Sequence, residues 1–485
     1  MNETIQCCLR IISPVHIGCD EVYEPMAFIL NENNYRLVHF DPLDFLRQLD
    51  VPAKKIFTGI CKKGTIESIL EIYKFMREKR FQGDEVEVCP GFIEQYQKTL
   101  ALSPRDSKKI QQELNNFTVS RTAFIPNSNR PYIPGSAIKG ALRTAYLKTQ
   151  ATKKNEPTPR GKNAARDLEK ALLDGGSFDT DPFRMLKITD FSLVGEVRTK
   201  IVYAVNRKKK LSKFNASGPY QILEVIEPGS LFEGRISVGE PEVGSGIKKP
   251  VTRDALLKSS EVFYIKEMIR ENQELKLIEA EPINVERKEE AFPVRLGRHS
   301  GAECMTIEGH RNIRIMRGKG NEPTYDKHAT TLWLAADSSK PDINKGLKPF
   351  GWVVIEQMSE DMIERVKLQE EEYLTLKKDT VNRRPKSDER GGREPAPAGK
   401  KSGSPLPQEK VASEIWDQAT LTWNPGNQTV IAIVEGKKAT LKGKESIPEM
   451  FHKILFEKRK SVTAKVEVEP VGGKNYRIIT INPDP

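Results

Sequence analysis

Residues 379–408 set the strongest limit on how this chain can fold, because they contain almost no apolar side chains. The stretch is full of Pro, Gly, Ser, Arg and Lys. A segment of this composition cannot bury enough apolar surface to offset the entropy that is lost on folding. We therefore predict a flexible linker at 379–412, which separates a large part at 1–375 from a small domain at 413–485.

The length and charge of the chain indicate several structural units and an acidic partner. A chain of 485 residues is too long for one ordinary domain, and units of ~150 residues each would give about three. The formal net charge is +11 and the isoelectric point is about 9.1. This excess favours a polyanionic partner such as nucleic acid, although the same charge can simply keep a protein of this length in solution.

No pattern in the sequence predicts a membrane or secreted protein. Apolar runs stay well short of the ~20 residues of a membrane span, and the first residues lack the charged and apolar regions of a signal segment. The six cysteines are scattered and form no CxxC pair. Reduced cysteines of this kind are typical of a cytoplasmic protein, so we expect a cytoplasmic location and no membrane partner.

Strand and helix patterns mix irregularly in the large part, which favours an α+β fold over a doubly wound sheet. Alternating apolar residues predict strands, and longer 3.6-residue periodicities predict helices. We expect strands at 4–12, on both sides of a turn at 31–34, and at 187–193, 200–205, 220–226 and 231–238. We expect helices from residue 41, at 253–280 and at 359–378, a helical insertion at about 52–117, and a mobile basic loop at 148–166.

The C-terminal domain is predicted to be rich in β-structure. Short strand patterns occur at 419–423, 428–434, 437–442, 461–469 and 475–481, and a helix pattern occurs at 448–459. The spacing fits a small β-rich module. An oligonucleotide-binding barrel is one interpretation, and a β domain that docks another protein is the other.

The segment from Tyr132 to Leu147 joins a Pro-Gly-Ser turn to a helix pattern and predicts an anion-binding helix start. Gly135 frees the backbone and Ser136 is a good N-cap, so we expect the helix to begin near Ala137. The first amides of such a helix are unpaired and attract phosphate, helped by the helix dipole.

The same helix carries a buried stripe and two cations on its flank. The stripe follows the i, i+3, i+4, i+7 spacing and consists of Ile138, Ala141, Leu142 and Ala145. Lys139 and Arg143 are four residues apart and therefore lie together, where they could border a bound phosphate. The alternative is that both are ordinary solvated residues and that Gly135 and Ser136 form an ordinary cap.

Three segments carry a family resemblance. The segment Tyr132–Leu147 resembles the IPGSSIKGALR-type motif of the RAMP superfamily, which contains the RNA-binding proteins of CRISPR effector complexes. The segment Ile12–Gly18 resembles the first strand of that family and the loop after it, and Leu296–Gly301 resembles its late glycine-rich loop. The order and spacing most resemble the terminal (fifth) RAMP subunits of type III-A Csm complexes, and the resemblance covers roughly residues 4–375.

The resemblance implies a fold, a function and partners. The fold would contain a ferredoxin-like core of the RNA-recognition type. The chain would bind and cap the guide RNA near its 3′ end and support guide RNA maturation in antiviral defence. Its partners would be the guide RNA, target RNA, a backbone RAMP subunit and a small helical subunit of the complex.

Two further segments are candidate contacts for an RNA backbone. The basic cluster 207–210, followed by Lys213 and Phe214, lies between two predicted strands, where a loop could reach phosphates. The segment 297–301 offers flexible amides beside a cation, a usable phosphate nest. Each also has a plain interpretation, a solvated basic loop and a glycine turn. The predicted RNA-binding residues are His16, Gly135, Ser136, Lys139, Arg143, Arg207, Lys208, Lys209, Lys210, Gly297, Arg298, His299 and Gly301. Tyr132, Phe124 and Phe214 could stack on bases or belong to the core.

The sequence does not support a catalytic role. His16 could act as a general acid or base in a metal-independent endoribonuclease that processes guide RNA precursors, and this is the alternative function. His299, Cys304 and His310 match no standard zinc spacing, and the chain has no Walker loop, GxSxG or HExxH motif. We expect no enzyme activity, no cofactor and no metal. A third interpretation is a protein scaffold whose charge is incidental.

Overall fold

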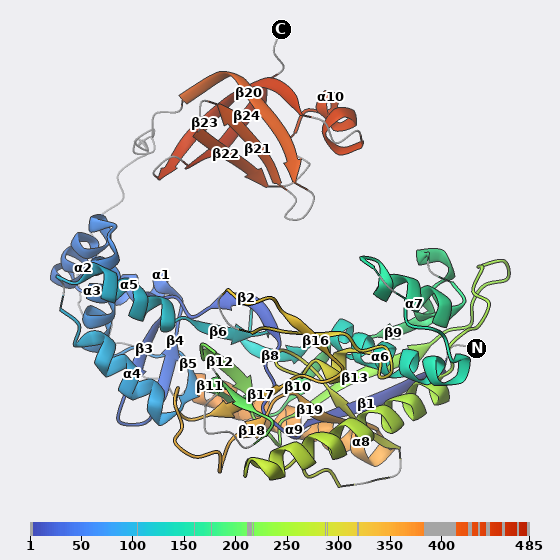
Figure 1. Ribbon diagram of the computed structural model, residues 1–485. Helices are drawn as coiled ribbons and strands as arrows, with labels where there is room; N and C mark the ends of the chain where they lie inside the picture. Colours follow the sequence, from blue (N-terminus) through green and yellow to red (C-terminus); the bar gives the residue numbers. More distant parts are fainter. Residues whose placement is uncertain are drawn as a thin grey trace, which may run out of the picture. The chain divides into compact units, whose positions relative to one another are not determined.

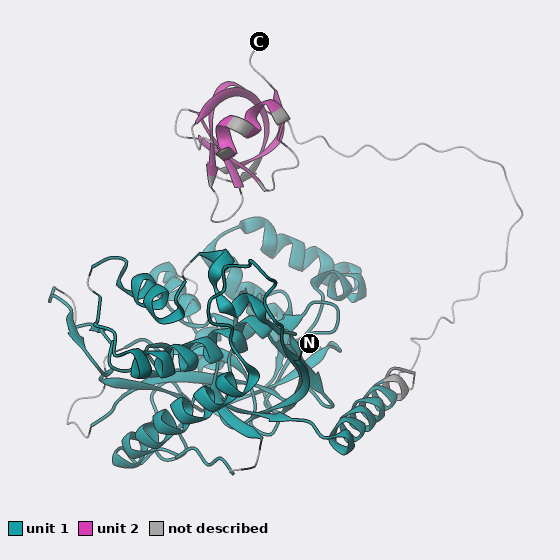
Figure 2. Ribbon diagram, turned by 90° about the vertical axis from the view of Figure 1, so that its right-hand side faces the viewer, with its two compact units in different colours: residues 1–385 teal, residues 386–485 magenta. Residues whose placement is uncertain are grey.

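The protein is described by a computed structural model with two compact units, Met1–Pro385 and Lys386–Pro485 (Figure 2). The structure describes residues 3–103, 105–159, 161–175, 177–210, 216, 218–286, 288, 290–317, 320–382, 414–424, 429–434, 437–442, 447–457, 461–472 and 475–482. The predicted linker at 379–412 lies outside the described residues from 383 onwards, and its first four residues continue a helix.

The described part of the first unit contains two large, mainly antiparallel sheets (Figure 1). One sheet has the order β14-β19-β1-β13-β10-β8-β7, with β9 also paired to β13. Its strands are β1 Glu3–Ile11, β7 Phe124–Ile125, β8 Arg130–Ile133, β9 Leu186–Ile188, β10 Phe191–Val194, β13 Leu231–Val238, β14 Ala291–Arg295 and β19 Trp352–Gln357. We call it the first sheet.

The second sheet has the order β2-β6-β12-β11-β5-β4-β3, and β17 and β18 extend it from β11. The pairs β5–β11 and β6–β12 are parallel. The strands are β2 Gly18–Val22, β3 Phe28–Asn31, β4 Arg36–His39, β5 Asp84–Val88, β6 Val119–Thr122, β11 Thr199–Lys208, β12 Gln221–Ile226, β17 Thr331–Ala336 and β18 Lys348–Pro349. A separate hairpin is formed by β15 Ile313–Ile315 and β16 Thr324–Asp326.

Helices cover both faces of the first sheet. In β1 successive side chains point to opposite faces of the sheet. Cys7 and Cys8 therefore belong to two different apolar clusters, one on each face. Cys7 belongs to the main core with residues of helices α6 and α8, whereas Cys8 packs with Val366 of helix α9. The helices are α1 Pro42–Gln48, α2 Val51–Lys63, α3 Ile66–Arg77, α4 Pro90–Leu100, α5 Ser107–Asn116, α6 Gly135–Lys154, α7 Ala164–Leu173, α8 Arg253–Leu277 and α9 Glu360–Asn382.

The prediction of a mixed α+β fold is confirmed, as are most of the predicted elements. The hairpin around 31–34, the helix that starts after Asp41 and the long helix α8 lie where the sequence placed them. The stripe of α6 is buried as predicted. Asp41 caps α1 by accepting a hydrogen bond from the amide of Leu43 at 2.7 Å, which explains why the Asp-Pro pair was a reliable signal.

Three predicted elements in the first unit are wrong in part. The strand predicted at 187–193 is two strands, β9 and β10, separated by Thr189 and Asp190. The predicted helical insertion at 52–117 also contains strand β5, because Val86 and Val88 alternate with acidic residues and are buried between β4 and β11. The predicted mobile loop at 148–166 begins inside α6, which continues to Lys154, and ends inside α7. Leu147 and Ala151 prolong the buried stripe of α6, so the helix does not end at the first polar residues.

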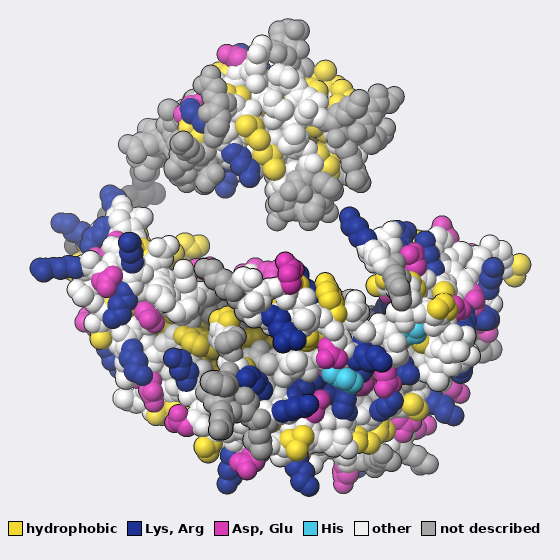
Figure 3. All heavy atoms as spheres, in the orientation of Figure 1, with side chains coloured by type: hydrophobic (Ala, Val, Ile, Leu, Met, Phe, Trp, Pro, Cys, Tyr) yellow, Lys and Arg dark blue, Asp and Glu magenta, His cyan; other side chains and the backbone are white. Residues whose placement is uncertain are grey.

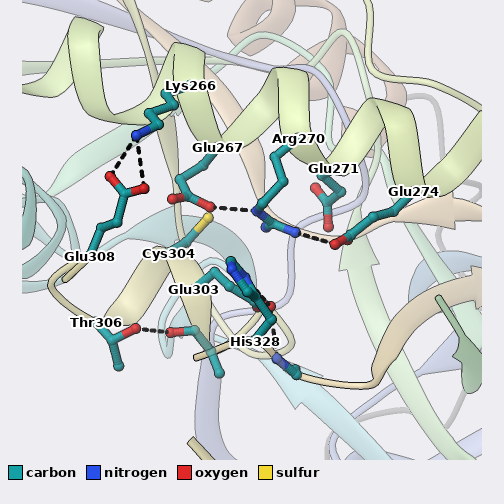
Figure 4. Close-up of polar contacts among 12 residues, drawn as sticks. Lys266, Glu267, Arg270, Glu271, Glu274, Glu303, Cys304, Thr306, Glu308 and His328 are labelled. Atoms are coloured by element: carbon teal, nitrogen blue, oxygen red, sulfur yellow. Dashed lines mark hydrogen bonds and ion pairs between the residues drawn. The ribbon is translucent and has the colours of Figure 1, made fainter. Parts of the chain in front are cut away.

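A network of charges, most of them buried, holds α8 against the segment 295–311, and Figure 4 shows the part that involves Lys266, Glu267, Arg270 and Glu274. Glu267 pairs with Arg270 at 2.8 Å and with Arg311. Glu271 pairs with Arg295 at 2.8 Å and accepts a hydrogen bond from the indole of Trp352 at 2.6 Å. Buried charges are tolerated when each has a partner and further hydrogen bonds, and these carboxylates meet that condition.

In the second unit, the described residues form a closed barrel in the order β20-β21-β22-β24-β23 (Figure 1). The strands are β20 Glu414–Asn424, β21 Thr429–Val434, β22 Lys437–Lys442, β23 Val462–Gly472 and β24 Asn475–Asn482. A short helix, α10 Glu449–His452, continues into a π-helical turn, Lys453–Glu457, before β23. These elements match the predicted strands and helix, and the barrel has an apolar core of its own.

Candidate nucleic-acid interface

The start of α6 differs from the predicted anion site. The helix begins at Gly135 rather than near Ala137, and its N-cap is Pro134, without a side-chain cap. The carboxylate of Asp190 accepts a hydrogen bond from the Gly135 amide at 2.8 Å. An acceptor from the β9–β10 turn therefore already occupies part of the site that a phosphate was expected to use, and Ser136, the predicted N-cap, is exposed.

Gly135 is required by close packing. A Cβ atom at this position would lie 2.4 Å from the carbonyl oxygen of Ile188. The chain could not accept that distance without moving the β9–β10 turn. The glycine of the motif thus allows α6 to start directly against the first sheet.

The two cations of α6 contact protein groups. Lys139 donates a hydrogen bond to the carbonyl oxygen of Leu186 at 2.8 Å, and burial lowers its pKa, with a further contribution from Lys187. Arg143 pairs with Glu169 at 2.7 Å and with Asp181 at 2.9 Å. In this structure both side chains join α6 to neighbouring segments, and their contact with RNA stays a prediction.

The first and third motif segments, far apart in sequence, contact each other. The amide of Arg298 donates a hydrogen bond to the carbonyl oxygen of His16 at 2.8 Å. Gly297 has φ +80°, and a Cβ on it would lie 2.3 Å from the same oxygen. The late glycine is therefore needed because the two loops pass each other at backbone distance.

His16 is buried inside this junction. Its Nδ1 lies 2.7 Å from the carbonyl oxygen of Glu224, and its Nε2 is buried without a hydrogen-bond partner. Burial lowers the pKa of His16, and this outweighs the backbone contact, which raises it. A neutral imidazole that donates from Nδ1 fits these contacts.

His299 holds the glycine loop to the second sheet. Its ring stacks on Trp333 of β17 with centroids 4.5 Å apart, and its Nε2 lies 3.1 Å from the side-chain oxygen of Gln221 in β12. Burial and the nearby charge of Arg298 lower the pKa of His299 to about 4. Arg298 itself is exposed, so the loop presents one cation outward while its neighbour packs inward.

The basic cluster is placed differently from the prediction. Arg207 and Lys208 belong to strand β11 rather than to a loop. Arg207 donates to the side chain of Asn344 at 2.8 Å and to the carbonyl oxygen of Pro341 at 2.7 Å. Lys209 is buried, with its ammonium group 2.5 Å from Glu303 and 3.2 Å from Glu274. Because its side chain is buried and paired with two carboxylates, Lys209 cannot make the predicted contact with RNA in this conformation. Lys213 and Phe214 lie outside the described residues.

A cavity of about 530 Å³ lies beside the end of β11. Arg207, Lys208 and Lys210 line it, and Lys340 and Tyr220 add a further cation and an aromatic ring. One carboxylate, that of Asp342, is among the described lining residues. Cations around a polar cavity next to an aromatic ring suit a phosphate chain with an unpaired base.

The cavity and the glycine loop share strands of the second sheet. Directly opposed residues of antiparallel strands lie on one face, and residues two apart along a strand do so too. Asn206 opposes Trp333, and Gln221 opposes Ala204. Lys208 therefore lies on the face to which His299 is bound, and the structure brings together the first motif loop, the glycine loop and the basic cluster. The start of α6 contacts the first sheet instead.

Trp333, Tyr220 and Lys340 were not identified from the sequence. Trp333 lies in an alternating strand pattern that gives no sign of its stacking partner, and Lys340 follows two serines in an ordinary turn sequence. Of the predicted aromatic contacts, Phe124 is covered by the guanidinium of Arg121, 3.6 Å from its ring centre, and Tyr132 is half-buried.

In the part of the chain that the structure describes, no group of three or more His, Cys, Asp or Glu residues is placed to hold a metal ion. The residues considered for zinc have other contacts. His310 is 3.0 Å from the hydroxyl of Thr158, and Cys304 is buried beside Arg295. None of the described helices is long and apolar enough to span a membrane.

On the face shown in Figure 3, Lys and Arg side chains are spread over the first unit and alternate with Asp and Glu. The net positive charge of the chain is therefore not gathered into one stripe on this face. A polyanion that approached this face would meet separate clusters of cations and no uniform positive field.

The chain belongs to the RAMP superfamily, whose family model matches residues 8–302. The three motif segments, from Ile12 to Gly301, all lie inside this range. The family predicted from the sequence is thereby confirmed.

Two similar curated proteins are both named CRISPR system Cms protein Csm5. The protein of Methanocaldococcus jannaschii is 25% identical over 226 residues, which cover 43% of this chain and 47% of that protein. The protein of Streptococcus thermophilus is 24% identical over 319 residues, which cover 63% of this chain and 80% of that protein. The chain thus spans about half the length of the first relative. The names agree with the predicted resemblance to subunits of Csm complexes.

A solved structure is also similar in part. It is a chain in the cryo-EM structure of a Csm-crRNA-target RNA ternary complex in a type III-A CRISPR-Cas system. The match covers 73% of this chain and 100% of that chain, with 18% sequence identity and a TM-score of 0.47.

Proposed function

We propose that this protein is a non-catalytic RNA-binding subunit of a type III-A CRISPR ribonucleoprotein. It would bind and cap the guide RNA near its 3′ end and support guide RNA maturation. Its neighbours would be a backbone RAMP subunit, a small helical subunit and, during interference, target RNA. Membership of the RAMP superfamily and the names of its relatives support this proposal.

The observation that carries the proposal is the group of accessible cations at the end of β11. Lys210 and Lys340 are exposed, Lys208 is half-exposed, and all three line the cavity beside Tyr220. The exposed Arg298 belongs to the loop that is bound to the adjoining strands. Contacts of this kind position a phosphate backbone and do not read its sequence.

The other predicted residues have supporting roles in this proposal. His16, Gly297 and His299 hold the glycine loop in place, Gly301 supplies a left-handed backbone conformation within it, and Arg207 shapes the wall of the cavity. Gly135, Ser136, Lys139 and Arg143 form a second predicted contact at the first sheet. We further infer that residues 1–375 form the RAMP core, with a ferredoxin-like arrangement within it, and that 413–485 is an added domain.

The alternative function, a metal-independent endoribonuclease, requires His16 to reach a scissile phosphate. A general acid or base must come within about 2.6–3.2 Å of the proton that it transfers. The imidazole of His16 is fully buried, and burial lowers its pKa. These properties favour a structural role for His16, in which it fixes the junction of two loops.

Removal of the cavity lysines tests the binding role. In the chain with Lys208→Ala, Lys210→Ala and Lys340→Ala, we expect weaker binding of single-stranded guide RNA in fluorescence anisotropy. The slope of log K against log salt should fall by roughly 2, because each lost phosphate contact contributes about 0.7 for single strands. A chain with Lys55→Ala, Lys62→Ala and Lys108→Ala loses the same charge from exposed helical positions. Equal losses in the two chains would contradict the assigned site.

Cleavage is tested separately. A labelled guide RNA precursor incubated with the purified protein in EDTA should remain intact. Specific cleavage that disappears in His16→Ala would overturn the non-catalytic proposal.

The position on the guide is tested by binding. Guides shortened at the 3′ end are compared with guides shortened equally at the 5′ end, and only the guides shortened at the 3′ end should bind more weakly.

A further inference from the structure

The barrel of the second unit has a strand order that defines its topology. Numbered within the barrel, the strands close in the order 1-2-3-5-4-1, and strands 3 and 5, β22 and β24, are parallel. The helical segment α10 lies between strands 3 and 4. This is a five-stranded Greek-key barrel of the oligonucleotide-binding type, whose usual ligand surface is the face of strands 2 and 3.

The family match ends at residue 302 and the barrel begins at 414. The RAMP superfamily therefore assigns no role to the barrel.

The outward side chains of β21 and β22 form one continuous surface with the second half of β20. Ile433 opposes Thr420 on one side and Lys438 on the other, and Ile431 lies between Thr422 and Thr440 in the same way. Ile433 is 47% exposed. Arg477 of β24 continues the surface next to Thr440. We call the described residues Thr420, Thr422, Ile431, Ile433, Lys438, Thr440 and Arg477 the barrel face.

The described acidic residues of β20 and β23 lie outside the barrel face. None of the described residues of the barrel face is acidic, whereas the outward residues of β23 include Glu467 and Glu469. Asp417 pairs with Lys465 at 2.8 Å, and Glu469 pairs with Arg477 at the border of the face, at 3.4 Å. The barrel thus separates a surface of cations, hydroxyls and apolar side chains from an acidic one.

We propose that the barrel face binds single-stranded RNA and gives the protein a second RNA-binding site. Lys438 and Arg477 would contact phosphates, the threonine hydroxyls would hydrogen-bond to bases or sugars, and Ile431 and Ile433 would lie under base rings. The choice of RNA as the ligand rests on the proposed function, because guide RNA is the nucleic acid that such a complex contains. Binding is expected to tolerate different sequences and to weaken with salt.

Photo-crosslinking of the full chain to single-stranded RNA that contains 4-thiouridine tests the site. Crosslinked peptides are identified by mass spectrometry after digestion. We expect crosslinks in peptides from 414–482, and we expect Lys438→Glu to reduce them roughly five- to tenfold, because one phosphate contact is replaced by repulsion. Lys465→Glu makes the same charge change on β23 and should leave them unchanged.

Several outcomes would overturn the proposal. They are an absence of crosslinks in the barrel, an equal loss in the Lys438 and Lys465 variants, and, in the assembled complex, crosslinks from the barrel face to a protein subunit in place of RNA. Crosslinks within 1–382 report separately on the cavity. The barrel proposal can therefore fail while the proposed function holds, and the reverse result is equally visible.

Discussion

Lys209 and Glu303 form a buried ion pair that joins the end of β11 to the segment after β14. The ammonium nitrogen lies 2.5 Å from the carboxylate oxygen, and the same oxygen accepts a hydrogen bond from the amide of Ala329 at 2.9 Å. Lys208 and Lys210, which precede and follow Lys209 in the sequence, line the cavity beside the end of β11. Of these three successive lysines, two line the cavity, whereas the one between them is buried and joins two segments of the fold.

Loss of one partner of this pair should destabilise the first unit strongly. Lys209→Met keeps the length of the side chain but leaves Glu303 buried without its ammonium partner. The free energy of unfolding should fall by about 3–5 kcal/mol, as is usual when half of a buried pair is removed. Urea denaturation measures the change. Lys210→Met, at the exposed neighbouring position, should change stability by less than about 0.5 kcal/mol, and an equal effect would contradict the buried pair.

At low pH, the ion pair of Lys209 and Glu303 should no longer stabilise the first unit. Burial alone would raise the pKa of Glu303, but Lys209 and Arg270 hold it at about 2. In the unfolded chain the pKa of a Glu side chain is roughly 4.3. Because the pKa of Glu303 in the folded protein is lower, the stability that the ion pair contributes is complete above roughly pH 4.3 and is lost as the pH falls toward 2. Denaturation curves at pH 5 and pH 3 should differ more in the wild type than in Glu303→Gln.

His299 should add a second pH dependence at higher pH. Its pKa is lowered to about 4 by burial and by Arg298, whereas an unfolded histidine titrates near 6.5. Stability from the neutral ring is therefore complete above about pH 6.5 and is lost as pH falls toward 4. His299→Phe preserves the stacking on Trp333 and should flatten the dependence of the melting temperature on pH in that window. An unchanged dependence of the melting temperature on pH would show that the ring of His299 is not held buried and neutral.

Gly297→Ala should displace the glycine loop. The new Cβ would meet the carbonyl oxygen of His16 at 2.3 Å, in addition to the strain of a left-handed backbone, φ +80°. We expect a stability loss of more than about 2 kcal/mol and weaker RNA binding. Gly309→Ala is the matched control, because Gly309 has φ +92° but open space around its Cβ. Its loss should stay near 1–2 kcal/mol, with RNA affinity unchanged.

The predicted contact at α6 is tested by Lys139→Ala with Arg143→Ala. Arg143 pairs with Glu169 and Asp181, so the double change should lower stability by about 1–2 kcal/mol through lost half-buried pairs. If the pair also contacts RNA, the salt slope of binding will fall by roughly 1.4, which is two contacts at about 0.7 each. An unchanged slope with lower stability would assign both cations to the fold alone.

The sequence predicted elements best where local chemistry decides the structure. The Asp-Pro start of α1, the hairpin at 31–34 and the five strands of the barrel each have turn or cap residues beside a clear periodicity. The errors have a common cause. Strand β5 and the end of α6 depend on partners distant in sequence, because β5 pairs with β11 and the last turns of α6 are buried by tertiary packing.

Candidate residues were harder to predict than elements. A run of four basic residues carries no signal that Lys209 will find Glu303 and Glu274 across the fold. In the same way, Ser136 met every local rule for an N-cap, yet the carboxylate of Asp190 satisfies the helix start. The contact between Gly297 and His16 could not be read from composition, although the family motifs singled out both of the loops that meet there.

The carboxylates of α8 also limit how the first unit can assemble. Outside α8, Glu267, Glu271 and Glu274 pair with Arg311, Arg295 and Lys209, which come from two separate segments, 295–311 and the end of β11. A displacement of α8 by one turn, about 5.4 Å, would leave several charges in the interior without a counterion. The helix can therefore dock in a single register, and only after both segments have arrived. Its docking should be a late and cooperative step in folding, and partly folded chains should leave α8 exposed to proteases.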